Sequence, residues 1–331
     1  MRILYVGGTG EISSACVEES KRAGHEVTIY NRGKTAGQSP PGVEHVIGEL
    51  GNDQTYGALA ERNFDVVCQF LAFEQETVER DIEFFSNHCG HYIFISSASV
   101  YRKPSPVPLV SEELPLGNPF WSYSRKKAAC ESRLLDAHQS SNFPVTIVRP
   151  SHTYRERLPS VVVHGDHLAW RVLNGKAVIV PGDGESVWTL THAEDFAKAF
   201  VQILGNRAAF GECVHITDNV GYTWNMIMRT ISNEIGVDVR VCNILSQTLV
   251  RYEPSWTGPL LGDKSNSMIF DTRKITRLTD NWQCRISLQQ GIKRTWPFVA
   301  ERLKRGYRPD DALDSLIDRI IEGHAVLQVG I

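Results

Sequence analysis

The chain has 331 residues, enough to bury a substantial core, and its 35 lysines and arginines nearly balance 38 aspartates and glutamates. A formal net charge of −3 argues against a general attraction to nucleic acid or to an anionic membrane. Seven scattered cysteines without a Cys-x-x-Cys pair argue against a disulfide framework, and no apolar run approaches the ~20 residues of a membrane span. We therefore expect a cytoplasmic protein with no membrane partner.

Short apolar runs alternate with helical patterns along the first 150 residues. The runs cover 3–6, 27–30, 43–47, 65–71, 92–95 and 145–148, and helices are expected at 11–23, 53–62, 76–87 and 122–138. This alternation is typical of βαβ units around a parallel sheet that is covered on both faces. The sequence therefore predicts an α/β fold with a Rossmann-type doubly wound sheet, and a dinucleotide-binding domain at 1–150.

A glycine-rich turn, Gly7-Gly8-Thr9-Gly10, stands between the first predicted strand and the first predicted helix. There Gly7 permits a tight turn, and Gly10 lets the backbone approach a pyrophosphate whose charge the helix start favours. The third glycine position of such a motif holds Ser13, which is still small. We expect a dinucleotide to contact this turn and later strand ends, at Gly7, Thr9, Gly10, Glu11, Ile12, Leu71, Ala72 and Pro150.

The second predicted strand ends in Asn31-Arg32-Gly33-Lys34, without the acidic residue that would bind a ribose 2′-hydroxyl. Arg32 is suited to pair with a 2′-phosphate instead. Alternatively, Arg32 covers the adenine or faces solvent. The expected cofactor is NAD or NADP, with a preference for NADP, bound in part by Asn31 and Arg32.

Tyr123 and Lys127 stand four residues apart in a predicted helix, so they share one face. A phenol ionises near pH ~10, and an adjacent ammonium favours the phenolate, which makes Tyr123 a candidate general acid and base. Ser97 and Ser99 follow the predicted fifth strand, at the edge where parallel sheets bind ligands. A Tyr-x-x-x-Lys pair alone is common on exposed helices; the glycine turn and the serines give it significance.

The order and spacing of Ser97, Tyr123 and Lys127 resemble the extended short-chain dehydrogenase/reductase family, in its NAD-dependent epimerase/dehydratase, nucleotide-sugar epimerase-like branch. The resemblance continues to about residue 296. It implies that Ser97 contacts the substrate oxygen, that Tyr123 transfers a proton, and that Lys127 binds the nicotinamide ribose while lowering the tyrosine pKa. Further motifs that carry it are Arg149-Pro150, Pro181-Gly182-Asp183-Gly184 and residues 191–197.

Several positions depart from the family's pattern. Ala98 and Ser99 stand where dehydratases carry an acidic pair, so elimination of water would lack its acid and base. Arg102 replaces a common glycine and puts a cation beside the site, and Trp188 replaces an arginine that often binds the nucleotide diphosphate. Substrate contacts are expected from Ser97, Ser99, Arg102, Trp188 and Trp256, and the cations that remain for phosphate are Arg155, Arg157, Lys264 and Arg308.

Residues 151–331 are expected to form mainly the substrate-binding α+β domain and C-terminal helices, with roughly 187–218 returning to the first sheet. The segment 253–267 is predicted to be a lid, in which Trp256 either covers a sugar or anchors the loop. His192 lies inside Thr191-x-x-Glu194, which predicts a capping box rather than a second catalytic base. No histidine spacing indicates a metal site. Helices are expected at 166–174, 192–204, 224–235 and 288–303, and small-sheet strands at 237–242 and 268–270.

An amphipathic pattern near the end of the chain places apolar residues at 313, 316, 317, 320 and 321, and Gly323 is the expected stop. This helix either docks on its own subunit or packs across a homodimer.

The resemblance implies NAD(P)-dependent hydride transfer at a secondary alcohol of a small molecule, most simply a nucleotide-sugar 4-epimerase. If the keto product leaves instead of staying bound, the chain is an NADP-dependent sugar ketoreductase or dehydrogenase. A looser resemblance to dehydrogenase-like chloroplast stem-loop RNA-binding proteins keeps a binding role open. The complete Ser-Tyr-Lys set and the charge of −3 argue against that role.

Overall fold

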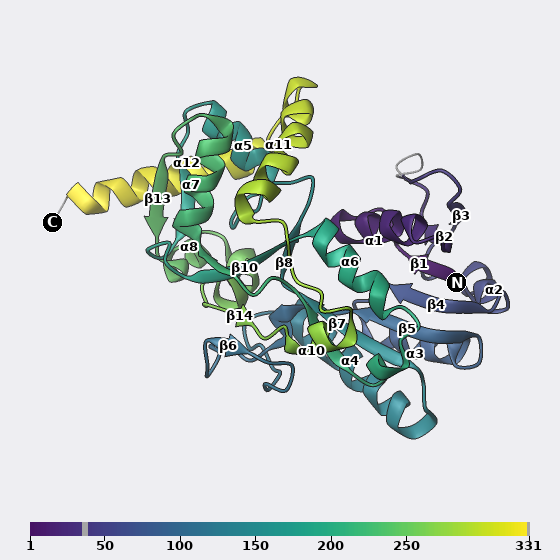
Figure 1. Ribbon diagram of the computed structural model, residues 1–331. Coiled ribbons are helices and arrows are strands. Elements are labelled where there is room, and N and C mark those ends of the chain that lie inside the picture. The colour runs from purple at the N-terminus through teal and green to yellow at the C-terminus, as the bar shows by residue number, and fades with distance from the viewer. Residues whose placement is uncertain (35–38, 330–331) are drawn as a thin grey trace.

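The computed structural model describes residues 1–34 and 39–329. Its centre is a seven-stranded parallel sheet in the order β3, β2, β1, β4, β5, β7, β11 (Figure 1). The doubly wound sheet is therefore confirmed. Its strands are β1 (Arg2–Val6), β2 (Glu26–Asn31), β3 (Glu44–Ile47), β4 (Phe64–Gln69), β5 (Cys89–Ile95), β7 (Val145–Pro150) and β11 (Cys213–Ile216).

Helices cover both faces of this sheet. Helices α1 (Glu11–Arg22) and α6 (Ala193–Ile203) lie on one face, and α2 (Asp53–Ala60), α3 (Gln75–Phe85) and α4 (Ser122–Ser141) lie on the other (Figure 1). Successive side chains of β1 pack on opposite faces of the sheet. Ile3 and Tyr5 lie on the side of α1, and Leu4 and Val6 lie on the side of α4. Burial on both faces explains why the strands read as continuous apolar runs.

The glycine turn lies where the strand order reverses, between β1 and its two neighbours β2 and β4. Gly7 and Gly8 adopt φ angles of +115° and +98°, which favour glycine. A Cβ atom at Gly8 would lie 2.9 Å from Cγ1 of Ile29, whereas Gly10 has a φ of −89° and precedes α1 as its N-cap. Gly8, for which the sequence predicted no role, is thus the most constrained residue of the turn.

Helix α4 is bound to β7 by a buried ion pair. Arg149 donates to Glu131 from Nε at 3.0 Å and from Nη2 at 2.6 Å, and the two side chains are 3% and 1% exposed. Arg149 also donates to the hydroxyl of Tyr101 and to the carbonyl of Glu112. These charge-assisted contacts fix α4 against the sheet, and with it the helix face that carries Tyr123 and Lys127.

The remaining strands form three small sheets. Strand β10 lies between β8 and β12, β9 pairs with β13, and β6 pairs with β14. Of the segment 187–218, helix α6 and strand β11 therefore join the main sheet, whereas β10 does not. These strands are β6 (Leu109–Val110), β8 (His152–Tyr154), β9 (Val178–Pro181), β10 (Val187–His192), β12 (Gly221–Thr223), β13 (Val241–Ile244) and β14 (Ile269–Phe270).

Helices α5, α7 and α11 of this second group lie close to the predicted positions, whereas α8 and α10 were not predicted. They are α5 (Gly165–Leu173), α7 (Trp224–Ile235), α8 (Ser246–Tyr252), α10 (Arg273–Leu278), α11 (Leu288–Lys304) and α12 (Asp311–Val329).

The segment predicted as a lid is helical and packed. It contains α9 (Thr257–Pro259) between a 3-10 turn and the short π-helix Leu260–Lys264. Asn118 Nδ2 donates to the carbonyl of Gly262 at 2.6 Å, and a Cβ atom at Gly258 would collide with the ring of Trp121. Trp256 is 9% exposed in a cluster with Leu249, so it anchors the segment.

The predicted capping box at Thr191 is wrong. Strand β10 extends through Thr191, whose hydroxyl accepts from the N–H of Asp218 at 3.0 Å. The N-cap of α6 is His192, whose Nδ1 accepts from the N–H of Glu194 at 3.4 Å, and the Glu194 side chain pairs with Arg294 instead. His192 still has a structural role, as a cap that accepts a hydrogen bond.

Helix α12 runs past Gly323, so the predicted stop there is wrong. Figure 1 shows the end of this helix extending beyond the rest of the molecule. Its first turns dock on their own subunit, where Ile317 and Ile320 are buried. Asp314 and Asp318 of these turns form ion pairs with Arg171 in α5 and with Lys176 just after it. Among residues 1–34 and 39–329, no helix is long and apolar enough to cross a membrane.

We predict that Glu131→Gln lowers the free energy of unfolding by about 3–5 kcal/mol, because it leaves the Arg149 guanidinium buried without a carboxylate. Chemical denaturation measures the change. The double variant Glu131→Leu, Arg149→Met removes both charges and should recover most of the loss. A Glu131→Gln protein as stable as the parent would show that the pair does not hold α4.

Candidate functional site

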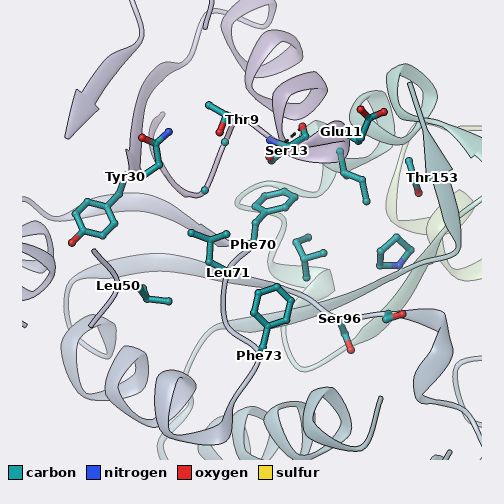
Figure 2. A pocket seen from close by; sticks show the side chains of 18 of the residues that line it. Thr9, Glu11, Ser13, Tyr30, Leu50, Phe70, Leu71, Phe73, Ser96 and Thr153 are labelled. Atoms are coloured by element: carbon teal, nitrogen blue, oxygen red, sulfur yellow. Dashed lines mark hydrogen bonds between the residues drawn. The ribbon is translucent and has the colours of Figure 1, made fainter. Parts of the chain in front are cut away.

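A cavity of about 910 Å³ opens at the carboxyl ends of the main sheet's strands. Figure 2 shows Tyr30 and Leu50 toward one end and Glu11 and Thr153 toward the other, with Phe70, Leu71 and Phe73 between them. Most of the predicted dinucleotide contacts line it: Gly7, Thr9, Gly10, Glu11, Ile12, Asn31, Arg32, Leu71, Tyr123, Lys127 and Pro150. Ala72 is fully buried and does not line the cavity, and its carbonyl group accepts a hydrogen bond from Lys127.

The shape and polar groups of this cavity fit a dinucleotide. Ser13 takes the place of a third glycine and stabilises the turn, because its hydroxyl accepts from the N–H of Gly10 at 2.9 Å (Figure 2). Two buried polar atoms of lining residues, Asn31 Nδ2 and Ser96 Oγ, have no partner within the described part of the chain. Because buried polar groups are nearly always hydrogen-bonded, both atoms are suited to a polar ligand.

Arg32 and Lys34 are exposed and line the cavity beyond the end of β2. The side chain of Asn31, at the last position of that strand, accepts from the N–H of Gly33 at 2.8 Å. The position that would carry an acidic ribose ligand thus holds an amide, followed by two cations. Preference for NADP stays a prediction.

Ser97 and Tyr123 lie together at another part of the cavity wall. The Ser97 hydroxyl hydrogen-bonds Tyr123 and lies 2.9 Å from the hydroxyl of Ser99, which in turn accepts from Ser124 at 2.7 Å. Ser99 does not line the cavity and is buried. It is therefore placed to orient Ser97 rather than to contact a substrate.

Lys127 is 2% exposed, with its ammonium at the cavity wall. Its Nζ donates to the carbonyls of Ala72 and Ile95, each at 2.7 Å, and lies 4.5 and 4.6 Å from the ring centres of Phe73 and Phe94. An ammonium has three N–H donors, so one remains for a ligand. Burial lowers the pKa of Lys127 to about 8, which leaves it mostly charged at neutral pH.

Burial raises the pKa of Tyr123; the hydrogen bond with Ser97 opposes this, and the negative charge of Asp263 adds to it. The expectation that Lys127 lowers this pKa is therefore wrong. The physical reason is that the Lys127 ammonium is directed at the two carbonyls. Tyr123 is thus a protonated phenol at neutral pH, the form that can donate a proton.

A second cavity of about 510 Å³ shares Glu11, His152 and Thr153 with the first. Apolar residues from the segment 158–163, together with Trp256 and Leu313, form much of its wall. Two cations line it, and both have carboxylate partners. Arg157 lies 3.2 Å from Glu11, and Lys264 lies 2.9 Å from Asp263.

The other predicted substrate contacts lie away from both cavities. Arg102 is exposed, and Trp188 is 1% exposed; neither lines either cavity. Trp188 Nε1 donates to the carbonyl of Lys264 at 3.0 Å, as Trp224 Nε1 does at 3.1 Å. The indole at the family's arginine position therefore holds the backbone of Lys264.

Sequence reasoning missed Phe73, Ser96 and Asp263. Phe73 and Ser96 follow β4 and β5 within a few residues, so the rule that ligands bind at strand ends would have found them. Asp263 has no motif and comes near Tyr123 only through folding. No group of three His, Cys, Asp or Glu side chains suited to a metal occurs in the ranges 1–34 and 39–329.

Comparison with curated proteins finds relatives of different activities. The chain is 28% identical over 249 residues to "Chloroplast stem-loop binding protein of 41 kDa b" of Arabidopsis thaliana, covering 71% of this chain and 63% of that protein. It is 23% identical over 292 residues to "2'-dehydrokanamycin reductase" of Streptomyces kanamyceticus, covering 86% of this chain and 80% of that one. The chain thus spans under two thirds of the stem-loop binding protein.

Among solved structures, UDP-glucuronic acid 4-epimerase from Bacillus cereus, in complex with UDP-glucuronic acid and NAD, superimposes with a TM-score of 0.75. It is 18% identical, and the match covers 91% of this chain and 99% of that one, which shows a common fold. Residues 3–217 match the model of the NAD dependent epimerase/dehydratase family. Because this match covers more than half of the chain, the protein belongs to that family.

Proposed function

We propose that the chain catalyses reversible hydride transfer between a nicotinamide cofactor and a secondary alcohol of a sugar. The observation that carries this proposal is the meeting of Ser97, Tyr123 and Lys127 on the wall of the cavity that begins at the glycine turn. When bound, the nicotinamide supplies or accepts the hydride. In this proposal 1–150, with α6 and β11, hold the dinucleotide, and 151–331 mainly form the substrate pocket.

Each of the three side chains has a distinct role in this proposal. Tyr123 gives its proton to the substrate's carbonyl oxygen during reduction, or takes one from the alcohol during oxidation. The Ser97 hydroxyl donates a hydrogen bond to the same oxygen. Lys127 binds the ribose through its third N–H.

Net reduction of a sugar ketone is the version that the geometry favours. A diphosphate needs cations, but Arg157 and Lys264, the two lysine or arginine side chains that line the second cavity, are already paired with carboxylates of the chain. Trp188, at the family's arginine position, is buried. The relative that is matched over 86% of this chain, a 2'-dehydrokanamycin reductase, supports this version.

Nucleotide-sugar 4-epimerisation is the second candidate. It requires the keto intermediate to stay bound while hydride returns to its other face. The second cavity supports it, since its 510 Å³ adjoins the first cavity at Glu11, His152 and Thr153 and leaves room for a large substituent on the sugar. A nucleotide diphosphate would then have to displace Glu11 or Asp263 from its cation partner.

Turnover assays separate the two versions. The purified protein is incubated with UDP-sugars and with keto sugars, with and without NADH or NADPH. For a reductase we expect one equivalent of reduced cofactor to be consumed per product, and no change in UDP-sugars. A new UDP-sugar stereoisomer without net consumption of cofactor would contradict the reductase version and support the epimerase.

We predict that Tyr123→Phe lowers turnover at least about a hundredfold, because the general acid is lost, while the dissociation constant of the cofactor stays nearly unchanged. Steady-state kinetics and fluorescence titration measure the two quantities. Tyr252→Phe, a surface phenol outside both cavities, is the control. Full turnover by Tyr123→Phe would refute the proton-transfer role, and undisturbed binding of structured RNA by the same variant would support the binding alternative.

The double variant Arg32→Ser, Lys34→Ser should weaken NADPH binding by about tenfold or more, because hydrogen bonds to charged groups contribute about 1.5–3 kcal/mol each. NADH, which lacks the 2′-phosphate, should bind almost as before. Isothermal titration with both cofactors measures the difference, and Lys21→Ser serves as a control outside the cavity. Equal weakening of both cofactors would refute the preference for NADP.

A further inference from the structure

Glu11 lies where the two cavities meet. It is the first residue of α1 and lines both of them, and Figure 2 shows it beside Thr153. Its Oε2 accepts from the backbone N–H groups of Arg155 at 3.1 Å and Glu156 at 2.9 Å, and its Oε1 accepts from Arg157 Nη1 at 3.2 Å. The carboxylate is therefore held between the first turn of α1 and the loop that follows β8.

This position puts a negative charge at the helix end that a dinucleotide phosphate would use. A carboxylate in the first turn already interacts favourably with the helix dipole, and it repels a second anion at the same end. The Arg157 side chain is 56% exposed, so water and salt screen its interaction with Glu11. The positive charge of Arg157 therefore offsets the charge of Glu11 only in part.

We propose that Glu11 weakens dinucleotide binding and thereby allows the cofactor to exchange between turnovers. The inference rests on the dinucleotide site of the proposed function and adds a residue that sets its affinity. Exchange suits net reduction, because each turnover converts one reduced nicotinamide into its oxidised form, which must leave. An epimerase regenerates its cofactor in place and does not need exchange.

The same helix face supplies a matched control. Glu18 lies two turns after Glu11, and its carboxylate binds Arg155 Nη2 at 2.6 Å, while Ser14 between them binds Arg155 Nη1 at 3.0 Å. Glu18 therefore holds the same loop as Glu11, but it lies outside the lining of both cavities. Removal of its charge should affect the loop without affecting a phosphate at the helix start.

The test measures dissociation constants of NADH and NADPH by fluorescence titration for Glu11→Gln, Glu18→Gln and Arg157→Gln. Glutamine keeps the size and an acceptor oxygen, so Glu11→Gln should bind both cofactors about three- to tenfold more tightly. Glu18→Gln should match the parent. Arg157→Gln should bind severalfold more weakly, because the positive charge that partly offsets Glu11 is then lost. At about 1 M salt, where the Debye length is about 3 Å, the dissociation constants of Glu11→Gln and of the parent should become nearly equal.

A purely structural role for Glu11 predicts that Glu11→Gln and Arg157→Gln change affinity in the same direction. That result, or unchanged affinity in Glu11→Gln, overturns the inference while leaving the proposed function intact. If Glu11→Gln does not fold, the Arg157→Gln variant tests the inference by itself. Tighter or unchanged cofactor binding by that variant overturns the inference. If neither the parent nor Glu11→Gln binds a dinucleotide at millimolar concentration, the proposed function fails and the inference fails with it.

Discussion

The ammonium of Lys127 is the contact on which the whole site depends. It joins helix α4 to two neighbouring strand ends, because it donates to the carbonyl of Ala72 after β4 and to that of Ile95 at the end of β5. A buried charge costs several kcal/mol unless its donors are satisfied, and these carbonyls and the rings of Phe73 and Phe94 meet most of that need. The third N–H has neither of these carbonyls as its acceptor, and Lys127 lines the cavity. Tyr123, one turn earlier, is held at the same wall.

Three cations around this centre pair with carboxylates of the chain. Arg149 pairs with Glu131 of α4, Arg157 with Glu11, and Lys264 with Asp263. A ligand that carries several negative charges would have to compete with these carboxylates, whereas a neutral sugar would not. This pairing is the reason why we favour an uncharged substrate.

Local patterns were enough to predict the parallel sheet, the glycine turn and the wall formed by Tyr123 and Lys127, because strand periodicity and motif spacing are properties of neighbouring residues. Features set by distant contacts were not predictable. Pairing with β8 extends β10 through Thr191 and moves the cap to His192. The segment 253–267 becomes helical where Gly258 and Gly262 pack against Trp121 and its neighbours. The raised pKa of Tyr123 depends on burial and on Asp263, far away in sequence.

Burial sets the protonation state of the Tyr123 and Lys127 pair. Burial acts on both members of the Tyr-Lys pair and disfavours the charged form of each, so it raises the pKa of Tyr123 and lowers that of Lys127 to about 8. At neutral pH the site therefore combines a neutral phenol with an ammonium that is still mostly charged. A phenol can donate a proton to a carbonyl at once, whereas oxidation of an alcohol must first generate the phenolate. Rising pH first removes the ammonium charge of Lys127, whose pKa is about 8, while the phenol of Tyr123 keeps its proton. The protonated phenol is the form that the proposed carbonyl reduction needs.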